Sequence, residues 1–192
     1  MTIKTALITG GASGLGYEFA TLLAKDAYHL ILIDIDSEKL KETKKKLEDK
    51  YKTQVITIRK DMSTHNCASE LFEEIKETPI DVLINNAGFG LYGHFHNTDW
   101  EREASMLNLH IISTTHLTKL ILKGMVEKGQ GKILNMSSLA AFQPGPLMSI
   151  YYASKAYILS FSEAIANELK GTGVTVTVLC PGQTKTSFQE VV

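Results

Sequence analysis

Residues 5–16 read TALITGGASGLG, and this stretch decides the fold. A short apolar run passes into a glycine cluster, and a helical pattern follows directly. Glycine lets the backbone turn sharply and approach a phosphate, while the first turn of a helix offers free N–H groups and the positive end of its dipole. Gly10, Gly14 and Gly16 are spaced G-x-x-x-G-x-G. The stretch therefore predicts a strand, a tight turn and a helix that together hold a pyrophosphate.

Two other interpretations of the glycine cluster are open. A triphosphate-binding P-loop needs Lys and then Ser or Thr after its last glycine, whereas Tyr17 and Glu18 follow Gly16. A plain strand-to-helix turn would use the same residues without any ligand. The cluster lies between the first buried strand and the first helix, and this position favours a dinucleotide site over a plain turn.

The rest of the chain repeats the order of strand and helix. Most strand-like runs are almost continuously apolar, which is typical of strands buried on both faces of a parallel sheet. Strands are predicted at 4–9, 29–34, 54–59, 80–85, 131–137 and 173–180. Helices are predicted near 14–26, 38–51, 65–77, 99–128 and 150–170. This alternation predicts a doubly wound, three-layer α/β/α fold with a parallel sheet, formed as one domain over residues 1–192.

Polar residues mark where the predicted helices begin and end. Ser37 is expected to be the N-cap of the second helix, and Thr98 or Asp99 that of the fourth. Gly171 follows the last helix, where a C-terminal glycine belongs. These residues set the expected helix boundaries.

The composition is that of a soluble globular protein, with 44% hydrophobic and 21% charged residues among 192. A net charge of −1 gives no reason to expect a nucleic acid or an anionic membrane as partner. Cys67 and Cys180 lack metal-ligand spacing and indicate ordinary thiols of a reducing compartment. We find no signal-peptide pattern and no apolar run near the ~20 residues of a membrane span. We therefore expect a cytoplasmic protein.

Two of the predicted helices are apolar around more than one face. The helix at 99–128 and the helix at 150–170 both carry more than the single apolar stripe that covering a sheet requires. The surplus indicates a second contact surface. We therefore predict a homodimer or homotetramer whose subunits pack through these two helices.

An acidic residue ends the second predicted strand. Asp34 lies about 20 residues after the last glycine of the loop, the spacing at which a carboxylate accepts hydrogen bonds from an adenosine ribose. A carboxylate there would repel a 2′-phosphate, and neither Ile35 nor Ser13 offers a positive charge. NAD is therefore favoured over NADP. Alternatively, Asp34 and Asp36 only initiate the next helix, which explains Asp36 better than Asp34.

The later half places a phenol beside an ammonium. Tyr151 lies four residues before Lys155 on one helix face, and Ser138 ends the preceding strand. A free phenol has a pKa of about 10 and is a poor base at neutral pH. A lysine one turn away favours the charged phenolate and so lowers that pKa. Tyr151 alone would more simply be a core aromatic, whereas Tyr152 lacks the spacing to Lys155 and is interpreted as the packing residue.

These motifs together resemble the short-chain dehydrogenase/reductase family. TGGASGLG, NNAG at 85–88, Ser138, YYASK at 151–155 and PGQTKT at 181–186 occur in the order and spacing of that family. The resemblance covers essentially the whole chain. It implies a Rossmann fold and an NAD(P)-dependent enzyme that moves a hydride between the cofactor and an alcohol or carbonyl substrate.

The resemblance also implies roles for single residues. Tyr151 would be the general acid/base, with its pKa lowered by about 3 units by Lys155 together with the positive nicotinamide ring of the oxidised cofactor. Ser138 would hold the substrate oxygen, and Lys155 would bind the nicotinamide ribose. Asn108 would support a water-mediated proton relay. The implied cofactor-binding residues are Gly10, Ser13, Gly14, Leu15, Gly16, Asp34, Asp61, Met62, Asn86, Gly88, Tyr151, Lys155, Pro181, Gly182 and Thr186.

The histidines are not expected to bind a metal. His94 and His96 are two residues apart without a third ligand, so residues 89–97 are better interpreted as a loop bordering the substrate pocket. The other four show no ligand pattern and are interpreted as structural or surface residues: His29, His65, His110 and His116. No metal site is predicted.

The sequence departs from the family at its end. It stops at SFQEVV, after the PG motif, where family members continue through a helical substrate lid and a further strand. We expect these 192 residues to be part of a longer protein; the alternative is a genuine short form with an altered pocket. Two alternatives stay open: the same chemistry with NADP(H), or a catalytically idle relative that senses a nucleotide or acts as a scaffold.

Overall fold

The computed structural model describes residues 3–182. Its strands are β1 (Thr5–Thr9), β2 (His29–Asp34), β3 (Val55–Arg59), β4 (Val82–Asn85), β5 (Gly131–Met136) and β6 (Val174–Leu179). Its helices are α1 (Gly14–Lys25), α2 (Ser37–Tyr51), α3 (Cys67–Ile75), α4 (Trp100–Leu107), α5 (Thr114–Lys128) and α6 (Ser149–Glu168), with a π-helical segment η1 (Asn108–Ser113) and a 3-10 turn η2 (Leu139–Phe142). Each predicted strand is present, and its ends differ from the prediction by at most two residues.

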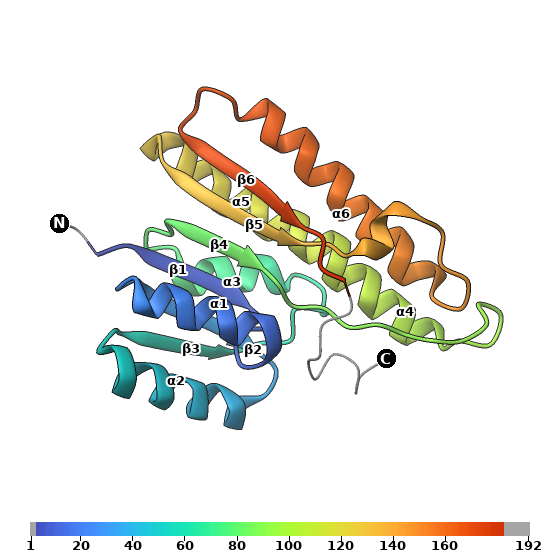
Figure 1. Cartoon of the computed structure of the whole chain (residues 1–192), viewed down its shortest axis with the longest axis horizontal. Coiled ribbons are helices and arrows are strands. Elements are labelled where there is room, and N and C mark those ends of the chain that lie inside the picture. Colours follow the sequence, from blue (N-terminus) through green and yellow to red (C-terminus); the bar gives the residue numbers. More distant parts are fainter. Residues whose placement is uncertain (1–2, 183–192) are drawn as a thin grey trace.

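The strands form one parallel sheet in the order β3-β2-β1-β4-β5-β6. The prediction of a doubly wound fold is confirmed, with helices on both faces of the sheet (Figure 1). The chain winds one way from β1 to β3 and the other way from β4 to β6, so β1 and β4 are neighbours at the point of reversal. In such sheets, ligands bind at the carboxyl ends of the strands beside this point.

Two apolar cores hold the layers together. On one face, α1 and α2 pack against the sheet through a cluster that includes Ala20, Leu40 and Leu47. On the other face, α3 and α5 pack through a cluster that includes Leu71 and Leu117. The strands β1 and β4 are buried along their whole length because both faces are covered. This rigid centre positions the loops that follow β1 and β4.

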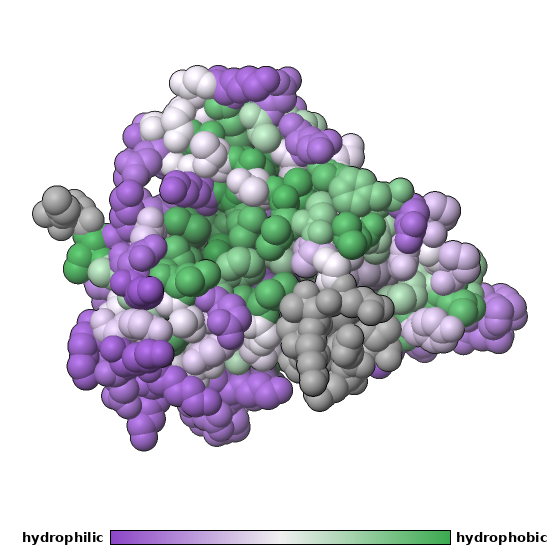
Figure 2. Space-filling view, viewed as in Figure 1, coloured by the Kyte–Doolittle hydropathy of each residue, from purple (hydrophilic) through white to green (hydrophobic). Residues whose placement is uncertain are grey.

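The edge strand β6 is covered less completely. Its residues alternate between half-buried and exposed after Val174, and Leu179 is 39% exposed. Figure 2 shows hydrophobic residues gathered over the β4–β6 part of the sheet, whereas hydrophilic residues gather over α2. Within residues 3–182, β6 is therefore an edge strand of the sheet.

The cap of the second helix was predicted wrongly. The N-cap of α2 is Asp36, not Ser37, and its carboxylate accepts hydrogen bonds from the backbone N–H groups of Glu38 (3.1 Å) and Lys39 (3.0 Å). A carboxylate one residue earlier reaches these amides, so Ser37 becomes the first helical residue. For the fourth predicted helix, Asp99 is the cap, and it accepts from the N–H of Arg102 at 2.9 Å.

The long helix predicted at 99–128 is interrupted. A six-residue segment between α4 and α5, η1, has π-helical hydrogen bonding. Such segments widen a helix locally and are frequent at functional sites.

Among the described residues, no helix combines the length and apolar character needed to cross a bilayer.

Candidate active site

A cavity of about 1220 Å³ lies at the carboxyl ends of the strands. It extends from the glycine loop after β1 to the start of α6, so it joins the two groups of motifs found in the sequence. Predicted site residues that line it are Gly10, Ser13, Gly14, Leu15, Asp34, Asp61, Met62, Asn86, Gly88, Ser138, Tyr151, Lys155, Pro181 and Gly182. Gly16 and Asn108 do not line it, and Thr186 lies outside the described residues.

The glycine loop is held tightly against the loop after β4. Gly10 has a φ of +65°, and a Cβ there would lie 2.9 Å from Nδ2 of Asn86. A Cβ on Gly16 would collide with the carbonyl oxygen of Gly10. Asn86 donates from Nδ2 to the carbonyls of Thr9 (3.0 Å) and Gly10 (3.1 Å). The glycines are therefore required by packing as well as by access to the start of α1.

Asp34 and Asp36 have separate roles. The carboxylate of Asp34 accepts hydrogen bonds from the N–H groups of Ala12 (3.1 Å) and Asp36 (3.2 Å), which fixes it at the cavity wall beside the glycine loop. Asp36 caps α2, and the hydrogen bond from the Lys39 backbone lowers the pKa of its carboxyl. Helix initiation thus explains Asp36 but not Asp34.

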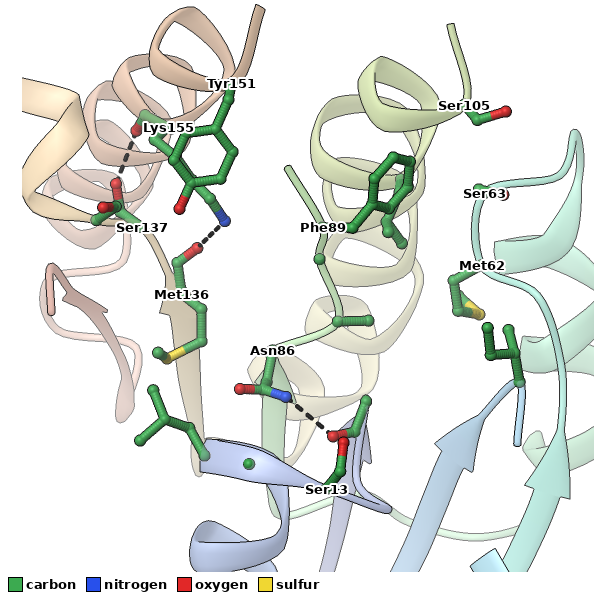
Figure 3. A pocket seen from close by; sticks show the side chains of 18 of the residues that line it. Ser13, Met62, Ser63, Asn86, Phe89, Ser105, Met136, Ser137, Tyr151 and Lys155 are labelled. Atoms are coloured by element: carbon green, nitrogen blue, oxygen red, sulfur yellow. Dashed lines mark hydrogen bonds between the residues drawn. The ribbon is translucent and has the colours of Figure 1, made fainter. Parts of the chain in front are cut away.

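A third acidic residue follows β3. The carboxylate of Asp61 accepts from the backbone N–H (2.8 Å) and the hydroxyl (2.7 Å) of Ser63. These bonds hold the turn that brings Asp61 and the buried Met62 to the cavity wall. Met62 and Ser63, which are labelled in Figure 3, lie across the cavity from Tyr151 and Lys155 of α6.

Tyr151 and Lys155 reach into the cavity from α6, as Figure 3 shows. Lys155 is buried, and its Nζ donates to the carbonyl of Met136 at 3.0 Å. Ser138 follows the end of β5; its Oγ accepts from the N–H of Ala140 at 3.1 Å and is hydrogen-bonded to Tyr151. The fold thus brings the serine, the phenol and the ammonium together at one wall of the cavity.

The electrostatics of this wall are dominated by burial. Burial raises the pKa of Tyr151 above its usual value, although the hydrogen bond with Ser138 acts in the opposite direction. Burial lowers the pKa of Lys155 to about 8, partly offset by Cys180. Nζ of Lys155 lies over the Tyr151 ring, 5.6 Å from its centroid. The lowering of the phenol pKa that we expect from Lys155 together with an oxidised cofactor stays a prediction.

Tyr152 packs rather than facing Lys155. Its ring fills the space beside Gly145, where a Cβ would collide with the ring atoms, and it makes an edge contact with the ring of Tyr151 at 6.1 Å. It also lines the cavity. Phe89 and Tyr92 line the cavity as well, in agreement with a loop that borders a pocket, while the stacked rings of His94 and His96 do not.

Asn108 binds the loop after β3 and does not line the cavity. Its Nδ2 donates to the backbone carbonyls of Ser63 (2.6 Å) and Thr64 (2.8 Å). These bonds tie η1 to the loop after β3. Asn108 thus fixes the π-helical segment in place.

Among the described residues, no cluster of three or more His, Cys, Asp or Glu side chains could hold a metal ion.

His110 is a residue that the sequence interpretation missed. Of the two expected settings, structural or surface, the structure shows the buried one: His110 is 2% exposed and its ring lies 5.9 Å from that of Tyr151. A signal was available, because Met106, His110, Ser113 and Leu117 recur at helical spacing and form a buried face. A histidine within such a face requires hydrogen-bond partners or a function.

Comparisons with known proteins agree with this geometry. A family model described as short chain dehydrogenase matches residues 4–192. Ketoacyl reductase HetN of Nostoc sp. is 35% identical over 184 residues, which cover 95% of this chain and 64% of that protein. The chain thus spans just under two thirds of that relative's length.

Solved structures show the same fold. A short-chain dehydrogenase from Sphingobium yanoikuyae in complex with NADPH has a TM-score of 0.92 at 30% identity, covering 97% of this chain and 73% of that one. A short chain dehydrogenase/reductase from Burkholderia phymatum in complex with NAD has a TM-score of 0.91 at 28% identity, covering 98% of this chain and 69% of that one.

Proposed function

The chain belongs to the short-chain dehydrogenase family, and from this premise we propose that it is an oxidoreductase that transfers a hydride between NAD(H) and an alcohol or carbonyl substrate. One observation carries the proposal. Ser138, Tyr151 and Lys155 converge on the cavity that also receives the glycine loop and Asp34. A redox cofactor and a proton donor would therefore share one space.

The residues present fit a dinucleotide. The turn between β1 and α1 has no room for a Cβ at Gly16, so the backbone and the start of α1 stay open toward a pyrophosphate. Each oxygen of Asp34 accepts one backbone N–H and retains capacity for a ribose hydroxyl. Asp61, Met62, Asn86 and Gly88 would flank the adenine and the ribose chain.

Tyr151 would exchange a proton with the substrate oxygen. The bound cofactor would give or take the hydride and, when oxidised, would bring a positive charge near the phenol. Such a charge is needed, because burial raises the pKa of Tyr151 in the protein alone. Lowering a phenol pKa by about 3 units corresponds to about 4 kcal/mol of differential stabilisation of the phenolate. Lys155, held on Met136, would supply part of it.

Two other residues would support this exchange. Ser138 is hydrogen-bonded to Tyr151 and would hold the substrate oxygen beside the phenol. Asn108 would act through the backbone, because its amide bonds keep η1 against the loop after β3. The resemblance assigns Asn108 to a water-mediated relay, and this role stays a proposal.

The preferred cofactor would be NAD(H), because Asp34 would repel a 2′-phosphate at the ribose. NADP(H) is the alternative, since solved structures of this fold include one with NADPH and one with NAD. The substrate would be a carbonyl or alcohol with an apolar body, because Phe89, Met148 and Tyr152 line the cavity near Tyr151.

We also propose that the protein is a cytoplasmic homodimer or homotetramer. Large apolar side chains on the outer faces of the helices support the assembly: Trp100 on α4 (61% exposed), Ile112 on η1 (58%) and Tyr157 on α6 (37%). Cys67 and Cys180 are both free thiols, which is in keeping with a reducing compartment. Light scattering at micromolar concentration would contradict the assembly if it gave a monomeric mass.

The test of the proposed reaction is Tyr151→Phe, with the neighbouring Tyr152→Phe as matched control. The substrates are a panel of alcohols and ketones, and turnover is followed by NADH absorbance. We expect Tyr151→Phe to bind NADH normally and to lose turnover by about 10²–10⁴-fold, the usual contribution of a general acid/base. Tyr152→Phe should retain most of the activity.

Two results would overturn the proposal. Wild-type activity retained in Tyr151→Phe would remove the phenol from the mechanism. NADH binding by the wild type without turnover of any substrate in the panel would favour the idle nucleotide-sensing relative instead.

A further inference from the structure

His110 is a buried titratable residue for which the mechanism above has no role. It lies on η1, beside the two residues of α6 that carry the proposed chemistry. Its ring makes an edge contact with Tyr151 at 5.9 Å between centroids and a tilted contact with Phe89 at 6.2 Å. With 2% of its surface exposed, it is shielded from bulk water.

The hydrogen bonds around His110 determine which ring nitrogen carries the proton. Nδ1 lies 2.8 Å from the hydroxyl oxygen of Ser154. That hydroxyl donates its one hydrogen to the carbonyl of Tyr151 at 2.7 Å, so it can only accept from His110. Burial, together with the nearby charge of Lys155, lowers the pKa of His110 well below its usual value. The ring is therefore neutral, with the hydrogen on Nδ1 and a lone pair on Nε2.

Nε2 of His110 is the ring nitrogen that remains as an acceptor. It is buried and finds no hydrogen-bond partner among the described residues. A Cβ placed on Gly88 would lie 2.8 Å from this nitrogen and 3.7 Å from Nζ of Lys155, so the two nitrogens flank the same small residue. A buried acceptor that is left unpaired costs about 1–3 kcal/mol, so a native structure rarely keeps one without a reason.

We propose that His110 is a positioning residue for Lys155: its Nε2 accepts a hydrogen bond from one buried water, which in turn accepts an N–H of the Lys155 ammonium. The site has the two polar groups that such a water needs. Met136 already accepts one N–H of the ammonium, so this bridge would engage a second. Gly88 keeps the space open, because a side chain there would collide with the imidazole.

The consequence for the reaction rests on the function proposed above. An acceptor beside the ammonium stabilises its charged form, and the charged form stabilises the phenolate of Tyr151. The titratable groups that face His110 are Lys155 and Tyr151 of α6, and Cys180 acts on Lys155. Without the acceptor, the pKa of Lys155 falls further and that of Tyr151 rises. Alcohol oxidation would then need a higher pH.

Two substitutions of His110 separate this role from packing. Asn places an N–H donor near the position of Nδ1 and nothing at Nε2, whereas Gln places a carbonyl oxygen near Nε2. We expect His110→Asn to lower kcat for alcohol oxidation about tenfold and to move the ascending limb of its pH profile up by about one unit. His110→Gln should follow the wild-type profile. If His110 only contributes to packing, both variants should instead lose activity in proportion to their loss of stability, without a shift in the pH profile.

A readout without turnover keeps the inference apart from the proposed function. The ε-carbon NMR signal of Lys155 should titrate at a lower pH in His110→Asn than in the wild type or His110→Gln. In the wild type, the ring nitrogens should show the neutral Nδ1–H form throughout pH 6–8. An Nε2–H form or an imidazolium in that range would overturn the inference, and this measurement does not depend on any variant folding. An unchanged Lys155 titration and pH profile in a folded His110→Asn would also overturn it. Failure of the wild type to turn over any substrate would contradict the proposed function alone.

Discussion

The two halves of the molecule bury different kinds of polar side chain. Through residue 80, the buried polar side chains among the described residues are all threonines: Thr5, Thr9, Thr43 and Thr53. From residue 81 to 182 the set contains amides, a histidine and charged groups: Asp81, Asn85, Glu103, Asn108, His110, Ser113, Thr118, Asn135, Ser137, Ser154, Lys155 and Ser162. The amide, histidine and charged side chains that are buried in the described residues thus all lie in the second half.

This difference follows from the task proposed for each half. A pyrophosphate can be held by backbone N–H groups at a helix start, so the first half needs close packing and no side chains at that point. A proton exchange needs an ammonium and a phenol in fixed positions, and both resist burial. The second half fixes them with a polar network that runs through its core. Asn85 donates to Thr118 (2.9 Å) and Asn135 (2.8 Å), and Asn135 donates to Ser162 on α6 (2.9 Å).

The largest effect is expected from a substitution that distorts the backbone of the glycine loop in the first half. In Gly16→Ala the new methyl would collide with the carbonyl of Gly10, so the turn must open. We expect NADH to bind at least about 100-fold more weakly, and the free energy of unfolding to fall by about 1–3 kcal/mol, as for other overpacked sites. NADH fluorescence titration and urea unfolding measure the two effects.

Gly124→Ala is the matched control, because a Cβ there has no neighbour within 4 Å. It should bind NADH normally and be as stable as the wild type or slightly more so. Normal NADH binding by Gly16→Ala would contradict the argument that the turn has no room for a side chain.

In the second half, we expect a substitution in the buried hydrogen-bond network to destabilise the fold. Asn135→Ala removes the fully buried amide that links β4, β5 and α6, and it leaves Asn85 and Ser162 without this partner. We expect the free energy of unfolding to fall by about 2–3 kcal/mol. The affinity for NADH should change less than turnover does. Thr177→Ala on the exposed side of β6 serves as control, and equal destabilisation by both substitutions would argue against the network.

A smaller effect of opposite sign is expected at Lys155. Its pKa is about 8 in the folded protein and about 10.4 in an unfolded chain. Between these values the unfolded state binds more protons, so stability rises with pH, and the destabilisation by the buried charge is fully present below about pH 8. This destabilisation amounts to about 3 kcal/mol. A substitution that removes the ammonium also loses its hydrogen bond to Met136, so the net gain in stability is smaller.

Lys155→Met should therefore abolish turnover and yet raise the free energy of unfolding at pH 7 by about 1–2 kcal/mol. Urea unfolding at pH 7 and pH 10 tests this, since the gain should shrink at the higher pH. Lys45→Met, at an exposed position of α2, should show no such dependence. If Lys155→Met were less stable than the wild type at pH 7, this would contradict the inference that the buried charge of Lys155 destabilises the folded protein.

The smallest effect concerns the ribose end of the first half. Asp34→Ser removes the carboxylate at the cavity wall, and we expect the preference for NADH over NADPH to fall about tenfold. Binding of both cofactors, followed by fluorescence, gives the ratio. Asp36→Ser, which retains a capping side chain on α2, should leave the ratio unchanged. An unchanged ratio in Asp34→Ser would show that Asp34 does not determine the preference for NADH over NADPH.

The sequence predicted the elements well where one periodicity dominated. The six strands are short apolar runs between polar turns, so their positions could be predicted to within two residues. The interruption of the long helix could not, because the hydrogen bonds of Asn108 to Ser63 and Thr64 join residues far apart in the chain. The cap of α2 was misassigned by one residue, since both Asp36 and Ser37 can cap a helix.

By itself, the sequence determined the doubly wound fold, the glycine turn and the spacing of Ser138, Tyr151 and Lys155, because these depend on local patterns along the chain. Only the tertiary structure decided the electrostatics. Burial raises the pKa of Tyr151 and lowers that of Lys155, and the packing of η1 against Gly88 places Nε2 of His110 and Nζ of Lys155 beside the same glycine. Desolvation and the orientation of a lone pair depend on which segments meet in space, and spacing along the chain does not determine them.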